Sequence, residues 1–354
     1  MAGDRVAVTA APGLAALTAE DLAAVPAAVV ERLLAARRVL TVCHRDPEAD
    51  ALGSALGLAL ALETLGKRVT PLCADPVPAM YDFMPHIGRF HQDPEPDVDY
   101  DLIVVGDCGE LARVGRVLDE HAELFGRVPI VDIDHHGSNT GFGVVDWIDP
   151  TAAATCEMDT LLMPRLGVPM DALEGDLAAI LMAGVVIDTA TFAHPNATPR
   201  TLRVAAELRA AGAPLSDISR RIYRTKPTQQ LRLFGLVLSR LESREQGRLV
   251  WSVLAPDDFH GSGAVPAMSE GIIDLLAQSE GSDVAILFKD QGSQTRISVR
   301  TRDGGVDAIE LTGAFGGGGH ARAAGATIAA PLDEARPLVL DRATALIQEL
   351  RGIA

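Results

Sequence analysis

Residues 38–62 read RVLTVCHRDPEADALGSALGLALAL. The stretch passes from a short apolar run into one histidine and three acids, between His44 and Asp50, and then into a long run of small apolar residues. The first run predicts a buried strand, and the second run, closed by Gly66, predicts a buried helix. A strand followed by a helix predicts the first unit of an α/β fold, with polar groups at the turn between the two elements.

Strands and helices continue to alternate up to about residue 213. Thr18 and Asp21 predict a capping box for a helix that reaches Arg37 and is kinked or restarted at Pro26. This alternation predicts a mainly parallel sheet with helices on both faces. Apolar runs predict further strands at residues 67–74, 100–107 and 128–134. Residues 176–192 predict a buried helix that runs into a loop, and Thr198 and Pro199 predict the start of another helix that reaches about residue 211.

The pattern changes in the last third of the chain. Residues 248–255, 283–291 and 295–301 predict strands, the last two paired across a turn, and residues 306–315 and 332–352 predict helices. We therefore expect four parts: a flexible tail (1–17), a larger α/β domain (18–213), a helical connector (214–244) and a smaller α/β domain (245–354).

Composition limits the classes of function. The net charge of −17 disfavours binding along long DNA or RNA, but allows a small phosphorylated ligand held by a few cations. Four scattered cysteines without a Cys-x-x-Cys pair favour a reducing compartment, and we expect a cytoplasmic protein. No apolar stretch approaches the roughly 20 residues that span a bilayer, so no membrane helix is expected.

Polar groups stand at the ends of three predicted strands. His44 and its acids follow the first, Asp107 ends another, and residues 134–136 (Asp-His-His) end a third, while Asp188 ends a predicted helix. The carboxyl ends of strands in an open α/β sheet meet at one crevice, so these groups should converge. A helix cap or a turn is the alternative for any one acid taken alone.

Such convergence predicts bound cations. Two carboxylates 4 Å apart repel by about 4 kcal/mol at an effective dielectric constant of about 20, so the acids must bind protons or metal ions. Interleaved histidines favour a metal with mixed nitrogen and oxygen ligands, such as manganese, iron, cobalt or zinc. A pair of ions bridged by one carboxylate would use these ligands best.

A glycine run, FGGGGHARAAG, occupies residues 315–325. Consecutive glycines allow backbone amides to approach phosphate oxygens. His320 and Arg322 follow within the run, and Arg300 precedes it, so cations are available for an anionic ligand. The alternative is a flexible glycine turn with a solvated arginine.

Taken together, these motifs resemble the DHH phosphoesterase superfamily. The resemblance is carried, in order, by the HxxPxxDALGS pattern of residues 44–54, by Asp107, by residues 134–136 with Asn139, by Asp188 and by the glycine run. It covers about residues 20–350. It is nearest to the subfamily with a DHH-associated C-terminal domain, which includes nanoRNA exonucleases, pAp phosphatases and cyclic-dinucleotide phosphodiesterases.

The resemblance implies a particular set of site residues. Two Mn²⁺ ions would be bound by His44, Glu48, Asp50, Asp107, His135 and Asp188, with Asp107 as the bridge. His136 would act beside the scissile phosphate, and Asp134 and Asn139 would support the ligands. The substrate's terminal phosphate and nucleotide would be bound by Arg300, Gly317, Gly318, Gly319, His320 and Arg322.

The first motif departs from the usual pattern. Relatives read H-x-x-P-D-x-D, whereas this chain has Glu48 after Pro47. Glutamate keeps the negative charge of aspartate and adds one methylene. The open question is therefore whether Glu48 binds the metal ion at the first position. Asp46 is the competing ligand.

The resulting hypothesis is a Mn-dependent hydrolase of short oligoribonucleotides, linear or cyclic dinucleotides, or 3′-phosphoadenosine 5′-phosphate (pAp). A hydroxide held between two metal ions would attack phosphorus, the C-terminal domain would close over the cleft, and the chain would form a homodimer by analogy. Two alternatives are an inorganic pyrophosphatase, which would not need the glycine run, and a nucleotide-binding sensor whose hydrolysis is weakened by Glu48.

Overall fold

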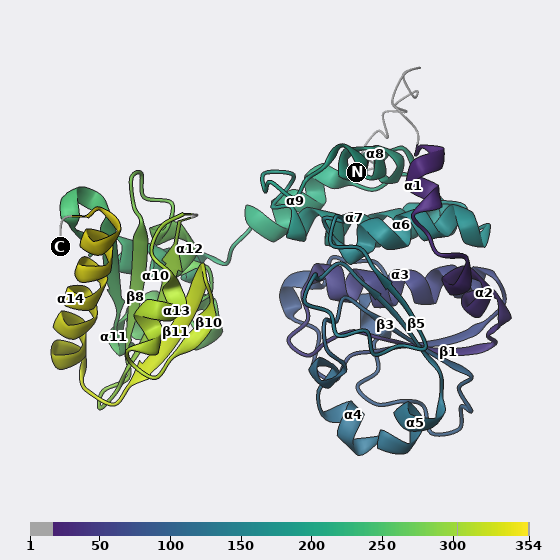
Figure 1. The fold of residues 1–354 in the computed structure, drawn as a ribbon, viewed down its shortest axis with the longest axis horizontal. Helices are drawn as coiled ribbons and strands as arrows, with labels where there is room; N and C mark the ends of the chain where they lie inside the picture. Colours follow the sequence, from purple (N-terminus) through teal and green to yellow (C-terminus); the bar gives the residue numbers. More distant parts are fainter. Residues whose placement is uncertain (1–16, 303, 353–354) are drawn as a thin grey trace. The chain divides into compact units, whose positions relative to one another are not determined.

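The chain, in a computed structural model that describes residues 17–302 and 304–352, folds into two compact units, Met1–Thr225 and Lys226–Ala354 (Figure 1). The division falls within the expected connector: helix α9 (Leu215–Tyr223) belongs to the first unit and α10 (Thr228–Leu238) to the second. The expected tail lies outside the described residues except for Leu17, which packs against the first core.

The first unit contains a five-stranded, entirely parallel sheet. The four strands predicted from sequence are present, and a fifth was not predicted. From β1 the chain first adds β2 on one side and then adds β3 on the other side of β1, so the strand order reverses between β1 and β3. Ligands of open α/β sheets bind at such a reversal. In spatial order the strands are β2 (Arg68–Leu72), β1 (Arg38–Val42), β3 (Leu102–Gly106), β4 (Ile130–Asp134) and β5 (Val145–Ile148).

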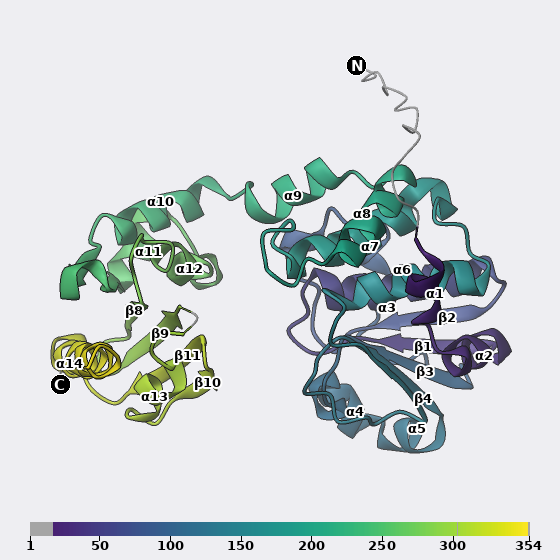
Figure 2. The ribbon, with the colours of Figure 1, turned by 45° about the horizontal axis from the view of Figure 1, so that its top comes forward.

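Helices cover both faces of this sheet, as expected (Figure 2). Alternate strand residues supply two cores: Val39 and Val104 face the larger helical layer, and Leu40 and Ile103 face the smaller one. The capping box of Thr18 is present. The larger layer comprises α9, described above, and α1 (Ala19–Ala23), α2 (Ala27–Ala35), α3 (Ala49–Thr64), α6 (Thr155–Leu166), α7 (Asp176–Asp188) and α8 (Pro199–Ala210). The smaller layer comprises α4 (Arg116–Glu120) and α5 (Ala122–Arg127).

Glycines allow α3, α6 and α7 to pack closely. A Cβ at Gly53 of α3 would lie 2.7 Å from Sγ of Cys156 in α6. A Cβ at Gly184 of α7 would lie 2.5 Å from Oδ1 of Asp50. Since both distances are shorter than van der Waals contact, the close approach of the three helices around Asp50 depends on these glycines.

The second unit contains a six-stranded mixed sheet in which only β7 and β8 are parallel. The hairpin predicted for residues 283–301 is present. The glycine run forms a strand pair that was not predicted. In spatial order the strands are β10 (Gly318–His320), β11 (Ala323–Ile328), β9 (Thr295–Thr301), β8 (Val284–Asp290), β7 (Leu249–Leu254) and β6 (Glu242–Arg244).

Helices also cover both faces of the second sheet (Figure 2). Ile286 and Val299 pack toward α13 (Ala308–Gly313) and α14 (Leu332–Leu350). Ala285 and Leu287 pack toward α10, α11 (Pro256–Ser262) and α12 (Ile272–Leu276). The predicted fold class, a larger unit with a parallel sheet and a smaller α/β unit, is confirmed.

Two further expectations concern helices and thiols. None of the helices in the described part of the chain is both long and apolar enough to cross a membrane. All four cysteines are buried, and none of them is in a disulfide.

Candidate active site

The ends of β1, β3 and β4 bring the predicted polar groups together. Nε2 of His44 lies 3.5 Å from Oδ2 of Asp107 and 3.8 Å from Oε1 of Glu48. These three residues form one cluster whose nitrogen and oxygen atoms could bind a single cation. The convergence expected from the strand ends is therefore present.

A second cluster lies beside the first. Nε2 of His135 lies 3.2 Å from Oδ2 of Asp188 and 3.4 Å from Oδ1 of Asp107. Asp50, His135 and Asp188 form a group that could bind another cation. Because one oxygen of Asp107 faces His44 and the other faces His135, this carboxylate lies between the two clusters.

The electrostatics of the two clusters favour a bound cation. Burial, and then the charge of Asp107, raise the pKa of both Glu48 and Asp50 well above the ordinary values. Burial would also raise the pKa of Asp107, but His135 and His44 outweigh it and hold that pKa well below its usual range. Burial lowers the pKa of His135, whereas Asp107 and Asp188 raise it to about 12. Protons thus compensate the clustered carboxylates when no metal ion does.

The donor set fits a divalent metal ion. Nε2 of His135 is buried and makes no hydrogen bond to any described residue, although two carboxylates lie within 3.4 Å. A buried ring nitrogen without a hydrogen bond, surrounded by carboxylate oxygens, is an arrangement that a metal ion satisfies.

His136 is oriented by residues behind it. Its Nδ1 lies 2.7 Å from Oδ1 of Asp134, and Asn139 donates from Nδ2 to Oδ2 of Asp134 at 2.7 Å. Asp134 is fully buried, whereas the His136 side chain is 38% exposed. Since the carboxylate can only accept, Nδ1 carries the proton and Nε2 remains available to an external group.

The structure places Glu48, and not Asp46, in the cluster. Glu48 is also the N-cap of α3: Oε2 accepts from the amide of Asp50 at 2.5 Å and Oε1 accepts from that of Ala51 at 2.9 Å. Asp46 is exposed, has a positive φ of 53°, and donates its amide proton to Asp75. Pro47 and the helix start therefore set the register expected from the motif.

Thr155 is a site residue that the sequence analysis missed. Its hydroxyl donates to Oδ1 of Asp107 at 3.1 Å, and its amide donates to Oδ2 of Asp50 at 2.6 Å. The amide of Cys156 donates to Oδ1 of Asp50 at 2.9 Å. Helix α6 was not predicted, and a threonine in an Ala-rich segment carries no motif, so no sequence signal identified it.

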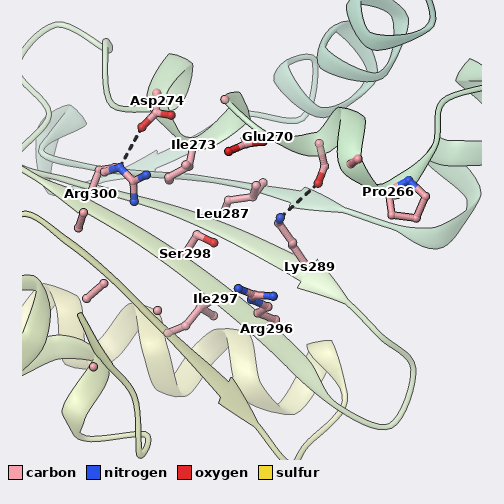
Figure 3. Close-up of a pocket in the computed structure, with 17 residues that line it drawn as sticks. Pro266, Glu270, Ile273, Asp274, Leu287, Lys289, Arg296, Ile297, Ser298 and Arg300 are labelled. Atoms are coloured by element: carbon pink, nitrogen blue, oxygen red, sulfur yellow. Dashed lines mark hydrogen bonds and ion pairs between the residues drawn. The ribbon is translucent and has the colours of Figure 1, made fainter. Parts of the chain in front are cut away.

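A separate pocket of about 490 Å³ lies in the second unit, on the sheet face below α12 (Figure 3). Arg300 lines it and donates from Nε to Oδ1 of Asp274 at 2.9 Å. In the strand register, Arg300 lies opposite Ala323, which in turn lies opposite His320. Arg300 and the glycine run are therefore neighbours in the second sheet.

The glycines of this run have a packing role. A Cβ at Gly317 would lie 2.6 Å from Cβ of Ala326, and Gly319 has a φ of +145° with its Cβ position 2.6 Å from the Ala323 carbonyl oxygen. Larger residues would separate β10 from β11.

Two of the predicted substrate residues, Arg300 and Gly318, line the pocket. The others, Gly317, Gly319, His320 and Arg322, lie outside its described lining. Arg322 donates to Oγ1 of Thr301 at 3.3 Å and to the carbonyl oxygens of Arg302 and Val306. These contacts link Arg322 to the turn after β9.

Sequence comparison identifies the family of both units. Residues 38–185 match the DHH family N-terminal domain, and residues 246–349 match the DHHA1 domain. The chain belongs to the DHH family.

Similar proteins span nearly its whole length. The bifunctional oligoribonuclease and PAP phosphatase NrnA of Thermus thermophilus is 37% identical over 299 residues, covering 84% of this chain and 86% of that protein. The protein of the same name from Bacillus subtilis is 27% identical, covering 85% and 92%. A crystal structure of an exopolyphosphatase-related protein from Bacteroides fragilis shares the fold, with a TM-score of 0.80, 22% identity and coverage of 94% and 98%.

Proposed function

We propose that this chain is a metal-dependent hydrolase of short nucleotide phosphoesters: short oligoribonucleotides, linear or cyclic dinucleotides, and pAp. The observation that carries the proposal is the carboxylate of Asp107 between His44 and His135, at 3.5 and 3.4 Å. The relatives named oligoribonuclease and PAP phosphatase support the substrate class.

The two clusters would hold two divalent ions, for which we propose Mn²⁺ because the ligands mix imidazole and carboxylate. His44 and Glu48 would hold one ion, Asp50, His135 and Asp188 the other, and Asp107 both. Bound divalent ions supply Lewis acidity: they offset charge on phosphoryl oxygens and make water a stronger nucleophile at neutral pH.

The protein's own groups orient the substrate and move protons. His136, whose Nδ1–H is fixed by Asp134, would direct Nε2 at the scissile phosphate. In its doubly protonated form the ring would donate from Nε2, and so stabilise the charge that develops there or protonate the leaving oxygen. Thr155 would hold the Asp107 carboxylate in position through its hydroxyl.

In the second unit, Arg300 and the β10–β11 backbone would bind the terminal phosphate and nucleotide of the substrate. Gly318 lines the same pocket as Arg300, so an anion there would meet the β10 backbone and a guanidinium that already pairs with Asp274 through Nε. Gly317, Gly319, His320 and Arg322 would contribute from the edge of that pocket. A pocket in the second unit favours a nucleotide as the substrate over pyrophosphate, because pyrophosphate has no nucleoside for the pocket to bind.

We further propose that the chain works in the cytoplasm, where its four thiols stay reduced, and as a homodimer. Light scattering during size-exclusion chromatography tests the dimer.

A substrate panel tests the function. Purified protein with Mn²⁺ is incubated with pApA, pAp, cyclic di-AMP, a short RNA and pyrophosphate, and Asp107→Ala is the control. We expect AMP from pApA and pAp, and none from the variant. Phosphate from pyrophosphate alone would identify a pyrophosphatase, and tight binding of pApA without AMP release would identify a sensor.

A further inference from the structure

Tyr223, the last residue of α9, is the only exposed aromatic residue of the chain. All phenylalanine, tryptophan and tyrosine residues lie in the part of the chain that the structure describes, and all except Tyr223, which is 39% exposed, are buried or half-buried. A described arginine or lysine stacks on Phe83, on Phe234 and on Trp251, but none stacks on Tyr223. Its ring therefore offers an apolar face to a ligand.

The hydroxyl of Tyr223 is held at the end of α7 that carries Asp188. It donates to the carbonyl oxygen of Ile187 at 2.8 Å and, with a longer bond of 3.4 Å, to that of Val186. Burial, and then the charges of Asp188 and Glu48, raise the pKa of Tyr223 to about 12, so the hydroxyl remains a donor at neutral pH. Because these carboxylates belong to the two metal clusters, the anchored ring lies beside both.

The turn after α7 helps to hold the helix that carries Tyr223. Ala190, Thr191 and Phe192 have φ values of 47°, 58° and 63°, a region that β-branched and bulky residues rarely adopt. Oγ1 of Thr191 lies 2.9 Å from Oγ of Ser219, so this turn is hydrogen-bonded to α9. Strain of this kind persists only where the surrounding structure imposes it, and it clusters at functional sites. The turn and α9 thus form a rigid support for the exposed ring.

A nucleobase is the group that fits this ring. The metal clusters would act on the scissile phosphate, and the base of the same nucleotide is joined to that phosphate through one ribose. A base stacked on an aromatic side chain binds roughly 5- to 100-fold more tightly than without the stack. A ring that is already fixed loses little conformational freedom when a base stacks on it.

We propose that Tyr223 stacks on the nucleobase of the nucleotide whose phosphate is hydrolysed, and so makes the first unit selective for nucleotide esters. This inference rests on the proposed function and deepens it, because it names the residue that recognises the base at the metal clusters. Every base has a face that stacks, so the selectivity is for the presence of a base and not for its identity.

Two analogues of pApA, each with an abasic residue in place of one adenosine, test the inference. For one of them, wild-type protein with Mn²⁺ should lose roughly 5- to 100-fold in kcat/KM. Tyr223→Leu should lower kcat/KM for pApA by a similar factor, and should cause no further loss on that analogue, because the base and the ring act as a pair. Independent losses on both analogues overturn the inference.

Two variants serve as controls. Tyr223→Phe keeps the ring without its hydroxyl, so kcat/KM for pApA should stay within a few-fold of wild type. Leu202→Ser replaces an exposed leucine of α8 and should change neither kcat/KM nor Mn²⁺ affinity. If Tyr223 only satisfies the carbonyl groups of α7, the Phe and Leu variants should lose activity equally on pApA and on both analogues, and this result overturns the inference.

Binding of a non-hydrolysable dinucleotide separates this inference from the proposed function. The ligand has a methylene phosphonate link and 2-aminopurine at the position that Tyr223 contacts. Stacking on the ring should quench the fluorescence, and Tyr223→Leu should restore it. Quenching by wild-type protein that hydrolyses no pApA refutes the function and supports the inference. Equal fluorescence with both proteins overturns the inference, even when wild-type protein hydrolyses pApA.

Discussion

Nδ1 of His136 lies 2.7 Å from Oδ1 of Asp134, whose carboxylate is fully buried. The other oxygen of Asp134 accepts from Asn139. Both oxygens are therefore engaged by donors, and together they fix the plane and the tautomer of the His136 ring.

Asp134→Asn should lower kcat for pApA by roughly 10- to 100-fold, because an amide has one oxygen for these two donors. Mn²⁺ affinity should change little, since Asp134 is not in either metal cluster. If the residue acts through His136, the double variant Asp134→Asn with His136→Ala should be no less active than His136→Ala alone. Additive losses of the two substitutions would refute this connection.

Glu48 is predicted to be a ligand as well as a helix cap. Glu48→Asp keeps a carboxylate and a favoured capping residue, so Mn²⁺ affinity and rate should stay within a few-fold of wild type. Glu48→Gln removes the charge that faces His44 at 3.8 Å and should weaken Mn²⁺ binding at least ~10-fold. Calorimetric Mn²⁺ titration measures this, and urea unfolding of both variants reports the capping contribution separately. Wild-type affinity in Glu48→Gln would leave Glu48 as a cap only.

Asp159 makes the stability of the metal-free protein depend on pH. This side chain is fully buried in α6, neither of its oxygens has a hydrogen-bond partner among the described residues, and burial raises its pKa from 3.8 to about 8. The folded state therefore binds a proton that the unfolded state releases above about pH 4, so stability is lost as the pH rises toward 8.

Asp159→Asn should stabilise the metal-free protein, and the gain in unfolding free energy should be at least ~1 kcal/mol larger at pH 8.0 than at pH 5.5. Urea unfolding at the two pH values measures it, with the exposed Asp97→Asn as a control that should show no such difference. Equal gains at both pH values would show that the buried carboxyl does not titrate in this range.

Gly184 is predicted to matter for metal binding as well as for packing. The Cβ of Gly184→Ala would lie 2.5 Å from Oδ1 of Asp50, whose carboxylate is held by the two α6 amides and cannot move aside easily. We expect a loss of about 1–3 kcal/mol in unfolding free energy and weaker Mn²⁺ binding.

Gly57→Ala is the matched control for Gly184→Ala, because its Cβ would lie 2.9 Å from Cδ2 of Leu181, the end of a flexible side chain. It should cost stability without changing Mn²⁺ affinity. A similar loss of affinity in both variants would contradict a specific effect through Asp50.

The parts of the fold predicted from sequence are those with a strong local pattern. Strands β1 to β4 are apolar runs because both faces of the parallel sheet are covered, and α7 is apolar on all sides because it is buried. The missed elements lack such patterns. Helix α6 buries Glu157 and Asp159 and contains Pro164, and β11 is rich in alanine and glycine, so its strand conformation depends on pairing with β9.

The same distinction applies to the site. The sequence was enough to predict that the polar residues following the strands lie close together, because parallel strands present their carboxyl ends at one edge of the sheet. The roles of Thr155 and of the Cys156 amide depend on which donor faces which carboxylate. These relationships arise only when segments distant in sequence pack together.

The first turn of α6 holds two of the acids in place at once: its amides bind Asp50 and the Thr155 hydroxyl binds Asp107. These acids are thus kept near each other by uncharged donors, independently of any ion. Folding itself brings these carboxylates together, so they need to move little when a cation binds. We expect that a cation binds at such a preorganised site without moving Asp50 or Asp107, and that the two carboxylates keep their positions between turnovers.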